Sequence, residues 1–380
     1  MTRVALLPAA ALLLAAGLGS IFAFDNAATT TTSTTSTTST TTTTVPRERA
    51  QPGWAVASSS ARGVMVDYKN EIVGPAAFRV LRLRARTTLL RWHVGLIDPP
   101  ARSGEVPADA GPAIFWPSEG LAGVVAVFNG AFKKTASGGG AVVDGVVLEP
   151  LVVGDMTIAI NARGHWSMGV WGSSTFPAKD FHAIAYRQNL RPLVQNSKLS
   201  ASANPANWAQ WGSPLNHNPL TPRTGLGVDA NGNLVFVATM SHVDIAQLGE
   251  ALVGAGAVTA MELDMNPYWP ILGASRTALH APGGVFAVQL PLSQHSPSIF
   301  ETGWLRDFFV ALAEPNSWSC DWTSPGVRSS ITAAQPQRLH LTGPGCHSTT
   351  ATTTTTSAAT TSTSSTTTTG SGATTTTGAG

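Results

Sequence analysis

The chain has 380 residues, and charged side chains make up 12% of them, against about 25% in an average domain. Its net charge of +2 argues against a dedicated nucleic-acid-binding protein, because such proteins present a strongly basic surface. The sequence shows no heptad or solenoid period, which excludes a coiled coil and a repeat array.

The first 27 residues predict an export signal or an N-terminal membrane anchor. Arg3 supplies a positive charge, and Val4–Phe24 is almost wholly apolar. About 20 apolar residues also suffice to span a bilayer, so cleavage and membrane anchoring stay open. In both cases Ala28 and the residues after it lie outside the cytoplasm, and we expect a secreted or extracytoplasmic cell-surface protein.

Two polar segments flank the middle of the chain. Residues 28–50 contain an unbroken Thr/Ser run from Thr29 to Thr44, and Ser348–Gly380 carries no charge. Such segments bury too little apolar surface to offset chain entropy, so we expect a disordered linker over 28–50 and a disordered tail over 347–380. Glycosylated stalks and plain linkers fit this composition equally well. The remaining residues, 51–346, are expected to form one folded domain.

The chain has two cysteines, Cys320 and Cys346. Outside the cytoplasm they are expected to form a disulfide. The absence of a CxxC motif or a Cys/His cluster argues against a structural zinc site, and we expect no cofactor.

Alternating residues over Val80–Arg86 predict a strand with one basic face, formed by Arg82, Arg84 and Arg86. We expect this face to be exposed to solvent. The alternative is a stripe that binds anions.

A second strand is predicted over Leu121–Phe128, and it leads into Asn129 and Gly130. An Asn side chain both donates and accepts hydrogen bonds, and a Gly lets backbone amides approach a ligand closely. Lys133 and Lys134 follow, but the spacing matches no phosphate-binding fingerprint. Taken alone, this motif indicates a surface turn.

A strand, a helix and a second strand are predicted over Leu234–Thr239, Val243–Leu252 and Val258–Met265. Ser241 is the expected N-cap of the helix, with Asp244 in its first turn. This order indicates a βαβ unit. Together with many short strands elsewhere, it predicts an α+β fold, a single mixed α/β domain.

Glu262 and Asp264 stand two positions apart on the last of these strands, so we expect both carboxylates on the same face. Such a pair repels unless a cation or a proton lies between the two groups, which suggests a functional site. A structural ion pair is the alternative. Trp269 follows in the loop at the carboxyl end of the strand, where open α/β sheets bind ligands, and its ring suits a sugar face.

Arg223 precedes a predicted strand in a charge-poor region. It can pair with Asp264 or hold an anion with two hydrogen bonds. His242, near the predicted start of the helix, is a further candidate. The sequence has no GxSxG or HExxH motif, which leaves serine hydrolases and zincins without support.

In this order, WHVGLIDPP, VVAVFNGAF, GGGAVVDGVV, RTGLGVDANGNLVFV and AMELD resemble the phosphodiester glycosidase domain family. The resemblance spans roughly Trp92 to Leu290. Known members remove N-acetylglucosamine from a sugar-1-phosphodiester. Asn129, Gly130, Arg223 and Asp264 match the family's motif positions. The family's Asp-Gly-Gly-Gly-Ser loop is replaced here by Met265-Asn266-Pro267-Tyr268-Trp269, which implies a different substrate or a loss of catalysis.

The resemblance implies an exported hydrolase of sugar-phosphodiester bonds that acts on cell-surface glycans. Asp264 is then the acid/base, and Arg223 is the group that neutralises the phosphate. Glu262 does not come from the resemblance; we expect it to act as the partner of Asp264 because both carboxylates are predicted on the same face of the strand. Asn129, Gly130, Trp269 and His242 are expected to bind the substrate. The alternative is a non-catalytic wall protein that holds an anionic glycan in the same cleft.

The expected partner is therefore a carbohydrate or sugar phosphodiester, and no nucleic acid. A metal between Glu262 and Asp264 is neither required nor excluded, and the oligomeric state stays open.

Overall fold

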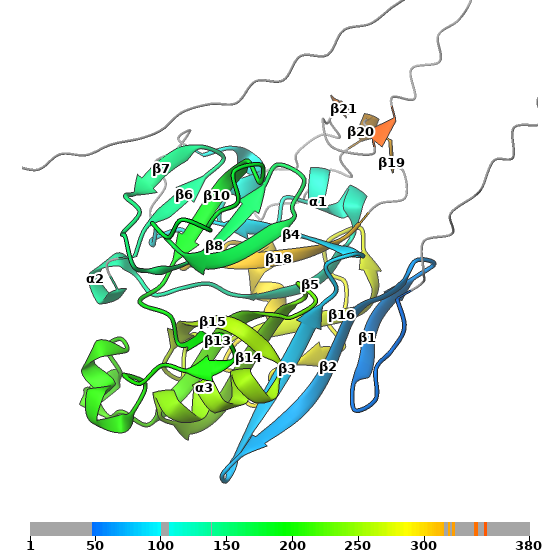
Figure 1. The fold of residues 1–380 in the computed structure, drawn as a ribbon. Coiled ribbons are helices and arrows are strands. Elements are labelled where there is room, and N and C mark those ends of the chain that lie inside the picture. The colour runs from blue at the N-terminus through cyan, green and yellow to red at the C-terminus, as the bar shows by residue number, and fades with distance from the viewer. Residues whose placement is uncertain are drawn as a thin grey trace, which may run out of the picture. The chain divides into compact units, whose positions relative to one another are not determined.

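The computed structural model (Figure 1) describes residues 48–99, 106–137, 139–314, 318–319, 321–323, 338–340 and 346–347. The chain divides into two units, Met1–Pro46 and Arg47–Gly380, and every described residue belongs to the second. In the described part of the chain, no helix has the length and hydropathy to cross a bilayer. The segment 1–27, Cys320 and the side chain of Cys346 lie outside the described residues, so the export signal and the disulfide stay predictions.

The largest sheet has eight strands, and all of its pairs are antiparallel. In spatial order they are β1 (Ala55–Ser60), β2 (Gly63–Val73), β3 (Ala76–Leu83), β14 (Leu234–Val243), β13 (Thr221–Asp229), β15 (Ala257–Met265), β11 (Val194–Gln195) and β12 (Lys198–Leu199).

A second, five-stranded sheet packs against the first. Its strands in order are β17 (Val288–Gln289), β16 (Leu272–Leu279), β5 (Val124–Asn129), β18 (Phe308–Ala313) and β4 (Thr88–His93). All six residues of β5 are buried. Phe128 of β5 lies 4.6 Å from Phe236 of β14 and 5.3 Å from Phe309 of β18, measured between ring centroids. Apolar residues of both sheets belong to one core cluster, and this contact fixes the position of β5 against the first sheet.

A third sheet also has five strands. They are β7 (Val146–Glu149), β6 (Ala141–Val143), β10 (Ala183–Gln188), β8 (Met156–Asn161) and β9 (Trp166–Val170). Two short pairs complete the described strands, namely β19 (Trp318–Ser319) with β22 (Cys346–His347) and β20 (Asp321–Thr323) with β21 (Arg338–His340).

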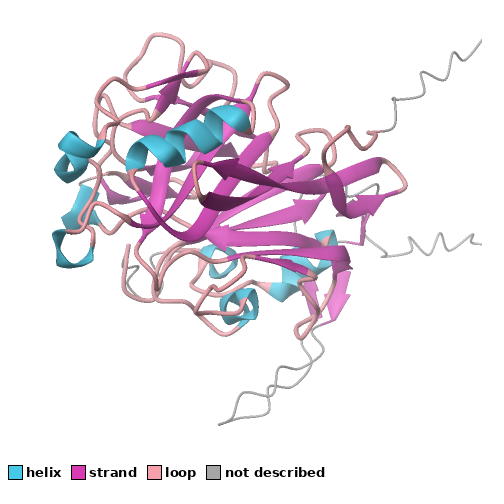
Figure 2. Ribbon diagram, turned by 90° about the horizontal axis from the view of Figure 1, so that it is seen from below, coloured by secondary structure: helices cyan, strands magenta, loops and turns pink. Residues whose placement is uncertain are grey.

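Helices are few and short, and strands make up most of the ribbon in Figure 2. They are α1 (Trp116–Ala122), α2 (Lys134–Ser137) and α3 (Ile245–Gly254), with 3-10 turns η1 (Ala108–Ala110), η2 (Pro205–Gln210), η3 (Leu215–His217) and η4 (Pro297–Glu301). The fold is therefore mixed, as expected, but the described part is mostly β-sheet.

The predicted strand–helix–strand unit is present as β14, α3 and β15. The two strands run parallel but are separated by β13, which pairs with both in the antiparallel sense. Leu248 and Leu252 of α3 pack into a core cluster with Val235 and Val237 of β14. The crossover therefore places β15 beside β13, where Asp264 and Arg223 lie on neighbouring strands.

The predicted N-cap of this helix is wrong. Asp244 caps α3, because its Oδ1 accepts a hydrogen bond from the Gln247 backbone N at 2.9 Å, and the Gln247 side chain accepts one from the Asp244 N. Ser241 lies on β14, which continues to Val243. Pairing with β13 holds these residues in strand geometry and delays the start of the helix.

The expected solvent-exposed basic face is also wrong. Arg82 and Arg84 are 5% and 2% exposed, and both donate to the buried Asp67. The ring of Trp54 covers the Arg82 guanidinium at 3.8 Å. Arg86 lies beyond the end of β3 and is exposed. This basic stripe is therefore a buried ion-pair network, which the sequence does not reveal because Asp67 comes from another strand.

Candidate functional site

Asp264 lies near the end of β15, at the point where the first two sheets are joined. Its backbone N donates to the Gly130 O at 3.0 Å, directly after β5. Its backbone O accepts from the Thr224 Oγ1 of β13 at 2.6 Å, and Thr224 in turn accepts from the Asn129 Nδ2 at 2.9 Å. Two strands from different sheets, β5 and β13, therefore hold the backbone of Asp264 on β15.

The Asp264 side chain is buried and bonded on both oxygens. Oδ2 accepts from Arg306 Nη2 at 2.9 Å, and Oδ1 accepts from the Met265 backbone N at 2.9 Å. Burial, with a small contribution from the nearby Asp307, raises the pKa of Asp264 to about 7. Arg306 and the Met265 N–H lower the pKa without cancelling the effect of burial. The carboxyl group therefore exchanges its proton near neutral pH.

Arg306 is the cation that pairs with Asp264, and it is 9% exposed. Besides Asp264 it donates from Nη1 to Asp98 Oδ2 at 3.4 Å. The Trp269 ring covers the guanidinium at 4.9 Å, within range for a cation–π contact. Two carboxylates and an indole hold the guanidinium in one orientation.

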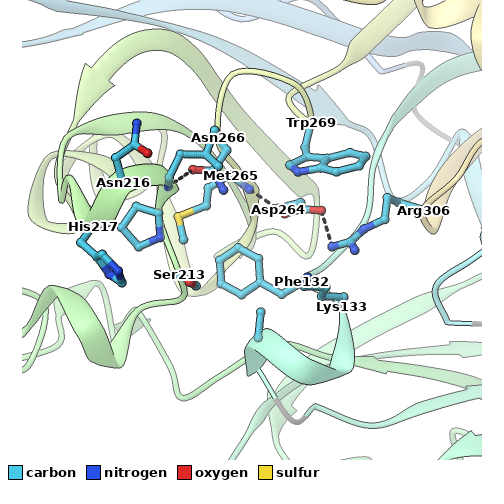
Figure 3. Close-up of a pocket in the computed structure, with 13 residues that line it drawn as sticks. Phe132, Lys133, Ser213, Asn216, His217, Asp264, Met265, Asn266, Trp269 and Arg306 are labelled. Carbon is cyan, nitrogen blue, oxygen red and sulfur yellow. Dashed lines mark hydrogen bonds and ion pairs between the residues drawn. The ribbon is translucent and has the colours of Figure 1, made fainter.

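A pocket of about 460 Å³ opens beside Asp264 (Figure 3). Three cationic or titratable nitrogen groups line it with a single carboxylate, and the remaining wall consists of aromatic, apolar and uncharged polar side chains. The lining residues are Phe132, Lys133, Ala136, Ser213, Pro214, Leu215, Asn216, His217, Asp264, Met265, Asn266, Trp269 and Arg306. This combination suits an anionic ligand that also carries a flat or apolar surface.

One wall of the pocket has an unusual backbone. Asn216, His217 and Asn266 all have positive φ, at 55°, 54° and 79°. Asn266 Oδ1 accepts from the Leu215 N at 2.9 Å and from the Thr221 Oγ1 at 3.3 Å. Non-glycine residues in this region cost of order 1 kcal/mol or more and concentrate at functional sites.

Glu262 and Arg223 form a separate buried pair. The Arg223 Nη1 donates to Glu262 Oε1, and both side chains are fully buried. Burial raises the pKa of Glu262 to about 7, while Arg223 lowers it and Asp264 raises it by a smaller contribution. Arg223 therefore pairs with Glu262 and not with Asp264. Neither Arg223 nor Glu262 lines the pocket.

A β-bulge accounts for the different surroundings of the two carboxylates. Along β13 and β15, Arg223 pairs with Met265 but Gly225 pairs with Glu262, so β15 has one extra residue in this interval. Each carboxylate consequently meets its own arginine. Burial raises the pKa of each carboxyl group to about 7.

Of the other predicted residues, Trp269 lines the pocket. Asn129 is 2% exposed, and its Oδ1 accepts from the Ile271 N at 3.2 Å, so its polar groups are used inside the protein. Gly130 accepts a hydrogen bond from the Asp264 backbone N through its own backbone O. His242 is exposed on β14. Neither of these two lines the pocket.

Arg306 and Asp98 escaped prediction. Arg306 lies directly before β18, and Asp98 follows β4 inside the WHVGLIDPP motif. Charged residues are scarce in this chain, and Arg306 and Asp307 stand together just before the apolar residues of β18. This pair of charges was the feature of the sequence that could have indicated a site at Arg306. Among the described residues, no group of three or more His, Cys, Asp or Glu side chains is placed to hold a metal ion.

Gly130→Ala is expected to destabilise the protein by about 2 kcal/mol. A methyl group there would overlap the Asp307 carboxylate and lie 2.7 Å from the Asp307 O. Thermal unfolding measures the loss. Gly111→Ala is the control, since its methyl group would meet only the Ala108 O, at 3.2 Å, with φ at −67°. Equal melting temperatures for the two variants would contradict the close packing under Asp264.

Comparisons with known proteins agree with the motifs. Residues 122–264 match the family model of the phosphodiester glycosidases. No curated protein matches the sequence.

Several solved structures are similar at low identity. The catalytic domain of zebrafish N-acetylglucosamine-1-phosphodiester alpha-N-acetylglucosaminidase, auto-inhibited by its pro-peptide, is 11% identical over 69% of this chain and 88% of that chain, with a TM-score of 0.40. A hypothetical protein from Synechocystis is 10% identical over 67% of this chain and 63% of that chain, with a TM-score of 0.40. A putative exported protein from Burkholderia pseudomallei is 11% identical over 66% of this chain and 75% of that chain, with a TM-score of 0.32. The predicted resemblance to the phosphodiester glycosidase family is confirmed by the family model, over residues 122–264.

Proposed function

We propose that this protein is an exported hydrolase that cleaves the bond between a sugar and a phosphodiester group in cell-surface glycans. The family match over residues 122–264 supports the reaction class. The observation that carries the proposal is Asp264, a carboxyl group with a pKa of about 7, paired with Arg306 at the wall of a 460 Å³ pocket.

Asp264 is the proposed general acid. The reaction breaks the bond between the sugar carbon and the phosphate oxygen, and water supplies the oxygen of the new sugar hydroxyl group. Asp264 donates its proton to the departing phosphate oxygen, and water releases one proton in exchange. A carboxyl group with a pKa near the working pH suits this role.

Arg306 and Lys133 are the proposed partners of the phosphate, since both line the pocket with Asp264. Trp269 is proposed to pack against the sugar ring, because its indole also lines the pocket. Trp269 belongs to the bulky loop that replaces the family's glycines, so an indole lies where the family has a glycine-rich backbone.

The remaining candidates are proposed to act through Asp264. Asn129 and Gly130 hold its backbone by the contacts described above. Arg223 and Glu262 fix the adjoining part of β15 as a buried pair. His242, which is exposed outside the pocket, is proposed only as a distant contact for a larger glycan.

The test is release of free sugar from a panel of sugar-1-phosphodiesters by the purified protein. We expect turnover that depends on Asp264 and Arg306. Binding of these compounds without turnover would contradict the hydrolase and favour the wall-associated glycan-binding protein. The replacement of the glycine loop is the observation that favours this second function.

The value of kcat/KM for sugar release is expected to fall as the pH rises above about 7. Asp264 acts as an acid only while it is protonated, and its pKa is raised to about 7, so the active fraction declines above that value. The measurement is kcat/KM from pH 5 to 9. A flat profile across this range would contradict the assignment of Asp264 as the acid.

A further inference from the structure

The pocket beside Asp264 has two ends that differ in chemistry. In Figure 3, Asp264, Arg306 and Trp269 gather at one end, and Asn216 and His217 lie at the other. The proposed function places the sugar and its phosphate at the first end. The phosphate of a diester carries a second ester group, and a pocket of about 460 Å³ is large enough to hold that group as well.

Apolar side chains line the pocket between these two ends. Phe132 and Met265 lie there in Figure 3, and they are 2% and 1% exposed. Pro214 and Leu215 also line the pocket, and the Leu215 side chain is 60% exposed. A group that extends from the phosphate towards the second end therefore meets apolar surface before it reaches the polar side chains there.

The backbone of this apolar wall offers few hydrogen-bonding groups to a ligand. The Phe132 O accepts from Arg187 Nη2 at 2.7 Å, and the Leu215 N donates to Asn266 Oδ1 at 2.9 Å. Pro214 has no backbone N–H. A ligand hydroxyl group placed here would lose its hydrogen bonds to water without gaining protein partners, which disfavours its binding. A methylene group has no such loss and gains by leaving water.

The wall is held in place without a ligand. The hydrogen bond from the Leu215 N to Asn266 ties the η3 turn to the loop after β15, and in the described part of the chain no other hydrogen bond joins residues 213–218 to residues outside 213–220. A methyl group on Gly212 would lie 2.5 Å from Met265 Cε and 2.7 Å from a ring carbon of Phe132. The chain that enters the turn therefore packs directly on both side chains, and the apolar wall is preformed.

We propose that this apolar wall, formed by Phe132, Pro214, Leu215 and Met265, binds the second ester group of the phosphodiester, and that this group is a hydrocarbon chain. The inference rests on the proposed function in taking the ligand to be a sugar phosphodiester. It adds that the substrate is amphiphilic, with a sugar on one side of the phosphate and a hydrocarbon alcohol on the other. Hydrolysis then yields the free sugar and the phosphate monoester of that alcohol.

The test compares phosphonate esters that resist cleavage, because a methylene group replaces the oxygen between the sugar carbon and the phosphorus. One set carries N-acetylglucosamine and a second set carries glucose. In each set the esterifying alcohol is glycerol, propanol or hexanol. Glycerol and propanol have the same carbon skeleton, so the first two esters differ only in hydroxyl groups.

Calorimetry with the parent protein measures the affinity for each ester. We expect the propyl ester to bind about tenfold more tightly than the glyceryl ester, because the added hydroxyl groups find no partners on the wall. The hexyl ester should gain about fourfold more for each further methylene group that the wall covers. Equal affinities for the propyl and glyceryl esters, tighter binding of the glyceryl ester, or no binding of any ester would overturn the proposal.

Leu215→Ser tests the wall itself, and the exposure of this side chain makes a loss of folding unlikely to interfere. We expect the affinity for the hexyl ester to fall by about fourfold or more, the contribution of one covered methylene group, with the glyceryl ester bound as before. Leu292→Ser is the matched control, since Leu292 is 87% exposed and lies outside the pocket lining. An unchanged preference for the hexyl ester in Leu215→Ser would overturn the proposal.

The outcome is independent of turnover. A preference for the propyl and hexyl esters, without cleavage of any sugar phosphodiester, would leave this inference standing and remove the proposed function. Turnover of sugar phosphodiesters without any preference among the alcohols would remove the inference and leave the proposed function.

Discussion

Asp264→Asn is expected to lower kcat for sugar release by about 10²–10⁴-fold, the usual contribution of a general acid. The amide keeps the shape of the side chain and can still accept a hydrogen bond from Arg306, but it has no proton of suitable acidity to donate. KM should change much less than kcat, because Arg306 and Trp269 remain in the pocket. Steady-state release of free sugar measures both constants.

Asp180→Asn is the matched control, since Asp180 is exposed. This variant should keep the parent rate. Thermal unfolding of Asp264→Asn shows whether the site has stayed folded. A folded Asp264→Asn protein with the parent rate would remove Asp264 from the mechanism.

Arg223→Ala is expected to lower the free energy of unfolding by about 3–5 kcal/mol, because it leaves Glu262 in the core without its counter-ion. It also removes the hydrogen bonds to the Val243 O at 3.2 Å and to the Pro219 O at 3.0 Å. The melting temperature should fall on the order of 10 °C.

The pH dependence of this loss follows from Glu262. Its pKa is raised to about 7 in the folded parent, above the value of an unfolded glutamate, so the folded state binds more protons than the unfolded state between about pH 4.5 and pH 7. Stability from this group is therefore present at low pH and declines as the pH rises towards 7. Without Arg223 the charged form is still less favourable, and the deficit of Arg223→Ala should be larger at pH 8 than at pH 5.

Chemical denaturation at the two pH values measures the deficit. Arg276→Ala, at an exposed position, is the control and should cost less than about 0.5 kcal/mol. The double variant Arg223→Met with Glu262→Leu should recover most of the lost stability, because it removes both buried charges together. An equal deficit at pH 5 and pH 8 would show that the pair is not the origin of the loss.

Local signals in the sequence predict much of the fold around the site. The apolar run that leads into Asn129 appears as the fully buried β5. The alternation and spacing around α3 predict β14, α3 and β15, since each pattern depends on neighbours within a few residues. The boundary at Ser241 was missed because β13 extends β14 by pairing, and a partner strand leaves no mark on the sequence of β14.

The candidate site was predicted in part, for the same physical reason. Asp264 and Trp269 stand at the end of a predicted strand, and both line the pocket. The pairing of Arg223 with Glu262 and of Arg306 with Asp264 could not be predicted from the sequence. It depends on the bulge in β15 and on Arg306, which is 42 residues from Asp264 along the chain.

The sequence by itself determined that charges are scarce, that a carboxylate ends an apolar strand, and that the motifs follow the order of the phosphodiester glycosidases. These features are local or sequential, so they can be read along the chain. The tertiary structure alone decided which charges meet. It buried Arg223 with Glu262 and placed Arg306 beside Asp264 in the pocket, because ion pairing depends on distance in space and on the loss of water around each group.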